Sequence, residues 1–396
     1  LPCLLYGAAA CSGGFSASFP LLVLCDTMSM RYCLFLGGGP LFAYAYTFLT
    51  ALVVTFLLTP AVKRFALKIG AVDKPNARKV HHGLIPRLGG LAIYAGFMVS
   101  ILCTVGISFE MVGIMLGATV LVLVGVVDDV YSLPAKVKLL GQIFSAAIVV
   151  IGFGIHIDWL VLPKVGLVYL PALISIPLTI FWIIGFINTV NLIDGLDGLA
   201  AGVAAIASVA IAMLAFQMGQ WESAACMVAM AGSALAFLQY NFNPAKIFMG
   251  DTGSMFLGYI IAVVSVLGAM KTAAAAVLFV PLIALTVPIM DTLMAIVRRK
   301  LSGIPIFAPD KSHLHHRLLA QGLDQKHVVL VMYALTAFFS CVALLVIHLK
   351  PYVGIAIVGG ALAVFLLWAK KLGVLKENMA TANPKEEHGL NGHVDK

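Results

Sequence analysis

Amide and acidic side chains recur at a fixed interval in one short polar segment. Residues 188–199 read Asn-Thr-Val-Asn-Leu-Ile-Asp-Gly-Leu-Asp-Gly-Leu, so Asn188, Asn191, Asp194 and Asp197 are spaced by three. On a helix this spacing stacks side chains on neighbouring turns of one face. Carboxylate and amide oxygens are the ligands that hard cations prefer. The stripe therefore predicts a site for Mg²⁺, with Mn²⁺ as an alternative, whereas a plain helix cap would explain only one aspartate.

Two other segments place carboxylates beside apolar runs. Asp128 and Asp129 are adjacent at the end of one run, where they repel each other unless a cation or basic partner is present. A solvated helix terminus is the alternative. Asp251 stands just before another run, where it either caps a helix or completes the metal site. Asn241 and Phe248, which precede it, offer an amide and a flat ring suited to a nucleobase.

Basic residues supply the complementary charge. The loop 70–90 ends in Pro-Arg87-Leu-Gly-Gly90, and a glycine pair that opens a helix allows backbone N–H groups to approach a phosphate. A mere excess of positive charge on the cytoplasmic side is the alternative. Lys138 begins an apolar run, at the level where its ammonium would meet a lipid phosphate.

A histidine cluster closes the longest basic loop. His313, His315, His316 and Arg317 fall within five residues. Zinc is disfavoured because no cysteine accompanies them and adjacent histidines chelate poorly on a helix. A site for phosphate and sugar groups fits better. Asp291, near the end of the preceding apolar run, is expected to be a buried hydrogen-bond partner.

The composition indicates which kind of secondary structure positions these polar residues. Of 396 residues, 62% are hydrophobic and 11% charged, whereas soluble domains carry about 25% charged residues. This predicts an all-α, polytopic integral membrane protein, and the net charge of +8 is weak support for nucleic acid as a partner. Eleven spans are expected, at 41–59, 89–108, 111–127, 139–156, 169–187, 199–217, 223–240, 253–269, 273–296, 329–348 and 353–369.

The positive-inside rule predicts the orientation of these spans. One set of alternating loops holds twenty-one Lys and Arg residues and the other set three, which places the N-terminus outside and the C-terminus in the cytoplasm. The candidate active site then lies on the cytoplasmic face. We expect a single transmembrane catalytic domain at 41–370, an N-terminal extension at 1–40 within which translation starts near Met28 or Met30, and a disordered cytoplasmic tail at 371–396.

Five motifs, in order, resemble those of the polyprenyl-phosphate N-acetylhexosamine-1-phosphate transferases. The branch they resemble most is the bacterial undecaprenyl-phosphate N-acetylglucosaminyl 1-phosphate transferase of glycosyltransferase family 4. The motifs are Asp73-Lys-Pro with Arg78-Lys-Val-His81 and Pro86-Arg87-Leu-Gly-Gly90, Asp128-Asp129, Asn188 to Gly198, Phe248-Met-Gly-Asp251-Thr-Gly, and His313-Leu-His-His-Arg317.

The resemblance implies an Mg²⁺-dependent transfer at the bacterial cytoplasmic membrane. Sugar 1-phosphate passes from UDP-N-acetylglucosamine to undecaprenyl phosphate, with release of UMP, as the first membrane step of teichoic acid or surface polysaccharide synthesis. The alternative is the related translocase that uses UDP-N-acetylmuramoyl-pentapeptide. A transporter or lipid flippase is less compatible with helix centres nearly free of charge. A homodimer is a further arrangement to consider.

The resemblance also implies a role for each motif residue. Asn191 and Asp251 would hold Mg²⁺, and Asp128 and Asp129 would sit beside the lipid phosphate, one of them as a base. Asp194 is either a neighbour of the metal or a nucleophile in a two-step reaction. The substrate-binding residues would be Lys138 for the lipid phosphate, Asp197, Asn241 and Phe248 for uridine, His313, His315, His316 and Arg317 for the sugar phosphate, with Asn188 and Arg87 nearby.

Overall fold

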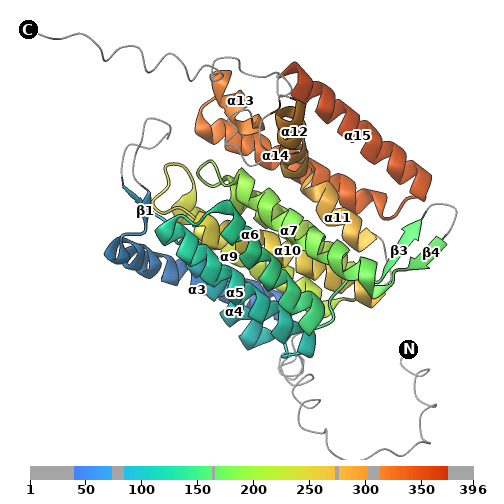
Figure 1. Cartoon of the computed structure of the whole chain (residues 1–396), viewed down its shortest axis with the longest axis horizontal. Helices are drawn as coiled ribbons and strands as arrows, with labels where there is room; N and C mark the ends of the chain where they lie inside the picture. The colour runs from blue at the N-terminus through green and yellow to red at the C-terminus, as the bar shows by residue number, and fades with distance from the viewer. Residues whose placement is uncertain are drawn as a thin grey trace, which may run out of the picture.

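Long apolar helices form almost all of the computed structural model, which describes residues 40–73, 84–162, 166–272, 276–301, 303 and 313–372. The expected extension before residue 40 and the tail after residue 372 lie outside these residues. Most helices run side by side between two ends of the molecule (Figure 1). They are α3 (Pro40–Ile69), α4 (Gly90–Thr104), α5 (Phe109–Tyr131), α6 (Ala135–Ala147), α7 (Ala172–Ile193), α8 (Leu199–Gln217), α9 (Trp221–Asn241), α10 (Gly250–Thr272), α11 (Ala276–Ala284), α12 (Thr286–Leu301), α13 (Leu314–Ala320), α14 (Gln325–Val346) and α15 (Pro351–Lys371).

The helices account for the apolar runs of the sequence, but not all of them as straight spans. Within the described residues nine helices are long and apolar enough to cross a membrane. A short π-helical turn, η1 (Ile148–Gly152), extends α6 to the required length, while α4, with 15 residues, is shorter. The chain is therefore a polytopic helical membrane protein, and each of the eleven expected segments lies mainly on helix.

The expected single span at 273–296 is instead a bent pair. Helices α11 and α12 meet at an angle of 71°. Pro288, in the first turn of α12, has no N–H to donate to the carbonyl of Ala284, so one continuous helix is disfavoured. The Thr286 hydroxyl donates to the carbonyls of Leu282 and Ile283 at the break. The bend redirects α12, which carries Asp291.

Helix α10 is the centre of the fold. It packs against α4, α5, α7 and α9, and 94% of its most apolar stretch is buried. Glycines allow the close approach: a Cβ on Gly90 would lie 2.1 Å from the nitrogen of Gly253, and one on Gly125 would lie 2.5 Å from the Cα of Thr252. Neither helix could carry a side chain there without moving away from α10.

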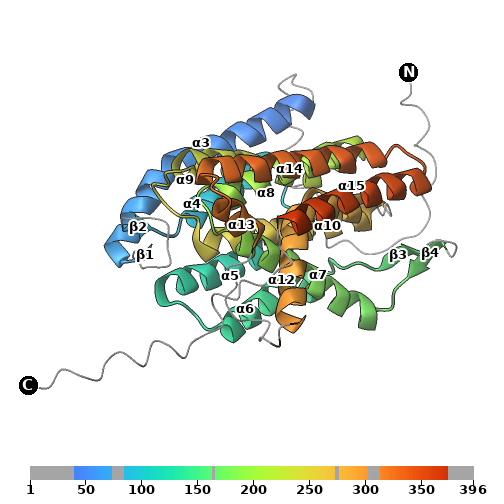
Figure 2. The ribbon, with the colours of Figure 1, turned by 90° about the horizontal axis from the view of Figure 1, so that it is seen from above.

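Two small hairpins interrupt the helices at opposite ends of the molecule (Figures 1 and 2). One pairs β1 (Val72–Asp73) with β2 (Ile85–Pro86), and the other pairs β3 (Trp159–Leu162) with β4 (Gly166–Tyr169), both antiparallel. An all-α reading misses both. The second hairpin also moves the start of the span expected at 169–187, because Tyr169 ends β4 and α7 begins only after Pro171.

Candidate active site

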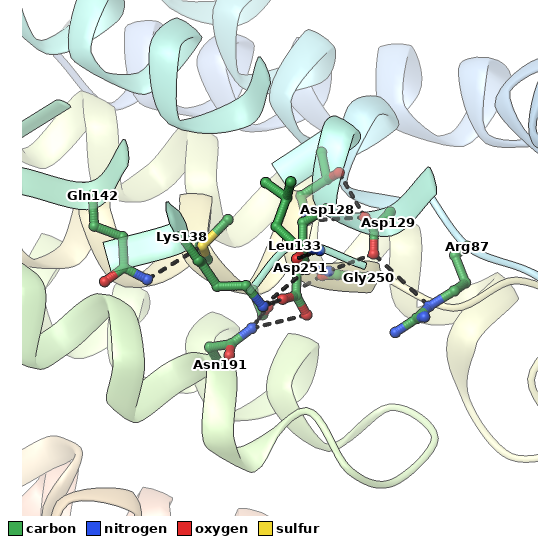
Figure 3. A network of polar contacts seen from close by, with 12 residues as sticks. Arg87, Asp128, Asp129, Leu133, Lys138, Gln142, Asn191, Gly250 and Asp251 are labelled. Atoms are coloured by element: carbon green, nitrogen blue, oxygen red, sulfur yellow. Dashed lines mark hydrogen bonds and ion pairs between the residues drawn. The ribbon is translucent and has the colours of Figure 1, made fainter. Parts of the chain in front are cut away.

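Four helices bring their polar ends together at one place. Asp128 and Asp129 lie in the last turn of α5, Lys138 lies near the start of α6, Asn191 near the end of α7, and Asp251 in the first turn of α10. Figure 3 shows these side chains directed toward one another. Residues up to 123 positions apart are thereby joined in one polar network.

A lysine ammonium lies between two carboxylates at the centre of this network. Lys138 Nζ is 2.9 Å from Asp128 Oδ2 and also contacts Asp251 Oδ2 (Figure 3). The turn between α5 and α6 holds this arrangement, since Leu133 N–H donates to Asp128 Oδ1 at 2.9 Å. The carboxylates of Asp128 and Asp251 repel each other in this half-buried site, and the Lys138 ammonium between them offsets that repulsion. The site is thus built to hold positive charge.

Asn191 and Asn188 have different partners. Asn191 Nδ2 donates to Asp251 Oδ1 at 3.1 Å and to the Ser254 hydroxyl at 2.8 Å, which leaves its carbonyl oxygen for other ligands. Asn188 instead exchanges hydrogen bonds with Gln142 on α6. Asn191 therefore belongs to the same network as Asp128 and Asp251, here called the carboxylate cluster. Asn188 instead links α7 to α6.

Asp129 caps helix α10 from another helix. Its Oδ1 accepts from the N–H of Asp251 at 2.9 Å, and its Oδ2 accepts from the N–H and the hydroxyl of Thr252 at 3.1 and 2.7 Å. Arg87 Nε lies 3.8 Å from Oδ1 and its Nη1 lies 3.7 Å from Asp73. Of the two roles open to Asp251, the helix cap is excluded, because the helix begins at Gly250 and the fully buried Asp129 side chain satisfies the first turn.

The glycine pair before α4 does not offer its N–H groups to a phosphate. Gly89 and Gly90 each donate at 2.9 Å to a backbone carbonyl, that of Phe248 and that of Met249. The expectation of a phosphate-binding turn is therefore wrong. Gly90 is required instead by its contact with Gly253. The same pairing fixes Phe248, whose own N–H donates to Pro86 at 2.8 Å.

Asp197 and Asn241 connect two loops beside the carboxylate cluster. Asp197 Oδ2 accepts from the Asn243 amide and from the N–H of Ala245, both at 3.0 Å. The buried Asn241 accepts from the N–H of Gly198 and donates to the carbonyl of Ile247, also at 3.0 Å. Both side chains hold the 241–248 segment in place, and their roles toward uridine stay predictions.

Asp194 caps the C-terminal end of α7 and directly precedes Gly195, which lies against His315. Burial among protein atoms raises the pKa of its carboxyl to about 8, and the nearby carboxylates of Asp251 and Asp129 add to the rise. Asp194 is therefore mostly the neutral acid at pH 7. A neutral carboxylic acid is a poor nucleophile.

The raised pKa of Asp194 predicts a specific pH dependence of stability. Between about pH 4 and pH 8 the folded protein binds more protons here than the unfolded chain does, so this contribution to the free energy of unfolding falls as pH rises. Asp194→Asn lacks the titrating group. The melting temperature of this variant minus that of the wild type should therefore increase from pH 5 to pH 8.5 in detergent without Mg²⁺. A constant difference would contradict the prediction.

The histidine cluster is held by helix α12. Asp291 Oδ2 lies 3.0 Å from His313 Nδ1, and its Oδ1 accepts from the N–H of Leu314 at 2.8 Å. This confirms the expectation that Asp291 is a buried hydrogen-bond partner. The rings of His313 and His315 stack with their centroids 5.7 Å apart, and the ring of His316 lies tilted against that of His315, with 4.3 Å between centroids. Burial lowers the pKa of His315 to about 3, so this ring is neutral at physiological pH.

The histidines lie against the acidic stripe. A Cβ added to Gly195 would lie 3.1 Å from His315 Nε2, so glycine there permits the contact between α13 and the 194–198 turn. Two sequence-distant motifs therefore form adjacent parts of one site. The rest of the loop before His313, from 304 to 312, lies outside the described residues.

The sequence analysis missed three residues that support the site. Gln142, Thr252 and Ser254 hold Asn188, Asp129 and Asn191 respectively. Serine and threonine within an apolar helix usually bond to their own backbone, and Ser254 also does so at Gly250. A glutamine inside an apolar run was the one available hint, since a buried amide requires partners.

Comparison with known proteins shows the family of this chain. The family model described as "Glycosyl transferase family 4" matches residues 111–269. A probable undecaprenyl-phosphate N-acetylglucosaminyl 1-phosphate transferase of Bacillus subtilis is 42% identical over 299 residues, which cover 75% of this chain and 83% of that protein. The chain belongs to glycosyl transferase family 4.

Two other relatives match over similar lengths. A decaprenyl-phosphate N-acetylglucosaminephosphotransferase of Mycobacterium tuberculosis is 35% identical over 83% of this chain and 88% of its own length. An undecaprenyl-phosphate alpha-N-acetylglucosaminyl 1-phosphate transferase of Yersinia pestis is 28% identical over 76% and 84%. The matched family region includes Asp128, Asp129, Lys138, Asn191 and Asp251.

The donor set around Lys138 suits a hard divalent cation. No preformed group of three or more His, Cys, Asp or Glu ligands occurs in the described part of the chain. Mg²⁺ needs fewer, since it binds through one or two carboxylates together with waters and substrate phosphates. Asp251 and Asp128 supply carboxylate oxygens on either side of a cation, and Asn191 keeps its amide oxygen available. These residues fit Mg²⁺.

Proposed function

We propose that this protein transfers N-acetylglucosamine 1-phosphate from UDP-N-acetylglucosamine to undecaprenyl phosphate, as the first membrane step of teichoic acid or another surface polysaccharide in the bacterial cytoplasmic membrane. The observation that carries the proposal is the meeting of Asp128, Lys138, Asn191 and Asp251 from four helices at one end of the bundle. The names of the relatives support both the sugar and the polyprenyl acceptor.

The reaction exchanges one phosphoanhydride for another. An oxygen of the lipid phosphate attacks the phosphorus that carries the sugar, the bond from that phosphorus to the oxygen of the UMP phosphate breaks, and UMP leaves with the electron pair. A phosphate monoester has a second pKa near 6, so the acceptor is already largely dianionic at neutral pH. Direct attack therefore needs neither a covalent relay through Asp194 nor full proton removal by Asp128.

The protein contributes mainly position and charge, which dominate catalysis of phosphoryl transfer. Lys138 neutralises the carboxylates before substrates arrive and is then able to bind the acceptor phosphate. Asp251, Asn191 and Asp128 would hold Mg²⁺ on the diphosphate of the donor. The bound ion would supply charge neutralisation of the diphosphate. The histidine cluster beside Gly195 would bind the sugar phosphate.

The decisive experiment measures UMP release from purified protein in detergent with undecaprenyl phosphate and Mg²⁺. UDP-N-acetylglucosamine is compared with UDP-N-acetylmuramoyl-pentapeptide as the donor. Release with the first donor alone supports the proposal, and release with the second alone moves the protein to peptidoglycan synthesis. Release with neither donor, from protein that elutes as a single folded species, would overturn the proposal and favour transport.

Arg317→Ala tests the assignment of the histidine cluster to the donor. Removal of a guanidinium that pairs with phosphate is expected to lower kcat/KM for UDP-N-acetylglucosamine by about 10- to 100-fold, equivalent to roughly 1.4–2.8 kcal/mol. The KM for undecaprenyl phosphate should change less than about twofold. Lys326→Ala, at an exposed position in the next helix, is the matched control. A larger effect on the lipid KM would place this cluster on the acceptor side.

A further inference from the structure

Asp291 is a buried acid whose function the reaction scheme leaves open. It lies on α12 beyond the bend, only 2% of its surface is exposed, and it belongs to none of the motifs that indicate the family. A carboxylate in such surroundings is costly unless it is hydrogen-bonded and paired. Its burial therefore requires compensating contacts.

Both carboxylate oxygens of Asp291 are directed at the start of the histidine helix. One receives the backbone N–H of Leu314 at 2.8 Å, and the other lies 3.0 Å from His313 Nδ1. His313 is the N-cap residue of α13, yet its own side chain makes no capping hydrogen bond. Asp291 thus fixes the backbone of α13 and the ring of His313 at the same time.

The contact at Nδ1 decides where His313 carries its proton. A carboxylate accepts hydrogen bonds, so the ring nitrogen that faces it must be the donor. In the neutral ring this leaves Nε2 as the acceptor. Carboxylate–histidine pairs of this kind set the tautomer and orientation of functional histidines in metal sites and in hydrolases.

The His313 ring in turn supports the rest of the cluster. It stacks parallel to the ring of His315, with 2° between the planes, and His315 lies against the 194–198 turn through Gly195. A change at Asp291 is therefore passed on to side chains next to Asp194 through packed rings. The bend between α11 and α12 orients this part of α12, so that Asp291 reaches the histidines.

We propose that Asp291 is a positioning residue that holds His313 in the Nδ1–H form and seats the histidine helix against the 194–198 turn. Its effect falls on use of the sugar-nucleotide donor. The kinetic part of this inference rests on the proposed function, whereas the tautomer of His313 does not depend on it.

The test is Asp291→Asn, which keeps the size of the side chain. The asparagine carbonyl still accepts from Leu314, but its NH₂ group then faces His313 and forces Nδ1 to become the acceptor. We expect kcat/KM for UDP-N-acetylglucosamine to fall about 10- to 100-fold, with the KM for undecaprenyl phosphate within about twofold of wild type. Thr292→Val is the matched control, because the hydroxyl of the neighbouring Thr292 donates to the Pro288 carbonyl of its own helix.

A double-mutant cycle with His313→Gln separates positioning from general destabilisation. If Asp291 acts through His313, Asp291→Asn causes no further loss in a His313→Gln background. If the two single-variant losses in kcat/KM instead multiply in the double variant, the inference is overturned. It is also overturned if the wild type releases UMP and Asp291→Asn has the same kinetics as the wild type.

Nitrogen-15 NMR of labelled histidine provides a readout independent of turnover. The His313 signals, identified by their absence in His313→Gln, should show protonated Nδ1 in the wild type and protonated Nε2 in Asp291→Asn. A wild-type ring with bare Nδ1 would overturn the inference even if the variant failed to fold. A wild type that releases no UMP would overturn the proposed function, and these shifts would still decide the His313 tautomer.

Discussion

Asp251→Asn is expected to lower UMP release by about 10³-fold or more without unfolding the protein. Asp251 is the carboxylate shared by Lys138 and Asn191, and it stands in the first turn of the central helix. The amide has the same size but no charge, so it weakens the hold on a divalent cation while it still fills the space. Charge stabilisation is the main contribution to phosphoryl transfer, and this contribution is lost.

Two measurements make the Asp251 prediction specific. Titration with Mn²⁺, followed by electron paramagnetic resonance, should show weaker binding in Asp251→Asn than in the wild type. Glu222→Gln is the matched control, because Glu222 pairs with Lys271 near the other end of α10 and should leave both readouts unchanged. Full activity in Asp251→Asn would remove this residue from the cation site.

Asp129→Ala is expected to damage stability and activity together. The substitution removes the acceptor for the N–H groups of Asp251 and Thr252, and for the Thr252 hydroxyl, at the start of a buried helix. Loss of hydrogen bonds to a buried charged group should cost about 3 kcal/mol, which corresponds to a melting temperature lower by roughly 5 °C or more. The backbone that carries Asp251 loses its anchor, so activity falls as well.

Asp129→Asn distinguishes this structural role from that of a base. The asparagine keeps one acceptor oxygen, so its melting temperature should lie between those of the wild type and Asp129→Ala, with activity following the same order. If Asp129 acted as a catalytic base, Asp129→Asn would instead lose activity while its melting temperature stayed at the wild-type value. Glu110→Gln, in the first turn of the same helix, is the control for charge removal.

The adjacent pair Asp128-Asp129 illustrates how far sequence reasoning reaches. The pattern showed correctly that two neighbouring carboxylates at a membrane boundary require basic partners, and the structure supplies Lys138 and Arg87. The pattern could not show that the two aspartates have different roles. Successive residues on a helix point about 100° apart, so Asp128 faces Lys138 while Asp129 faces the start of α10.

The glycines at 89 and 90 show the opposite outcome. Glycine before a helix has two uses that look alike in sequence: exposure of N–H groups to an anion, or close contact between backbones. Only the position of Gly253 and the carbonyls of Phe248 and Met249 decides for the second use. Such contacts depend on which helices become neighbours, and local pattern does not contain that information.

The sequence by itself determined that the chain is a polytopic helical membrane protein. A membrane-spanning helix must form all its backbone hydrogen bonds internally and expose apolar side chains to hydrocarbon, so each span appears in the sequence as a long apolar run. It also determined the family, because the polar motifs are local and ordered. The tertiary structure alone decided that Lys138 lies between Asp128 and Asp251, that Asp129 caps α10, and that Asp291 holds His313. These pairs join residues far apart in the chain, and their energies arise only after the helices pack.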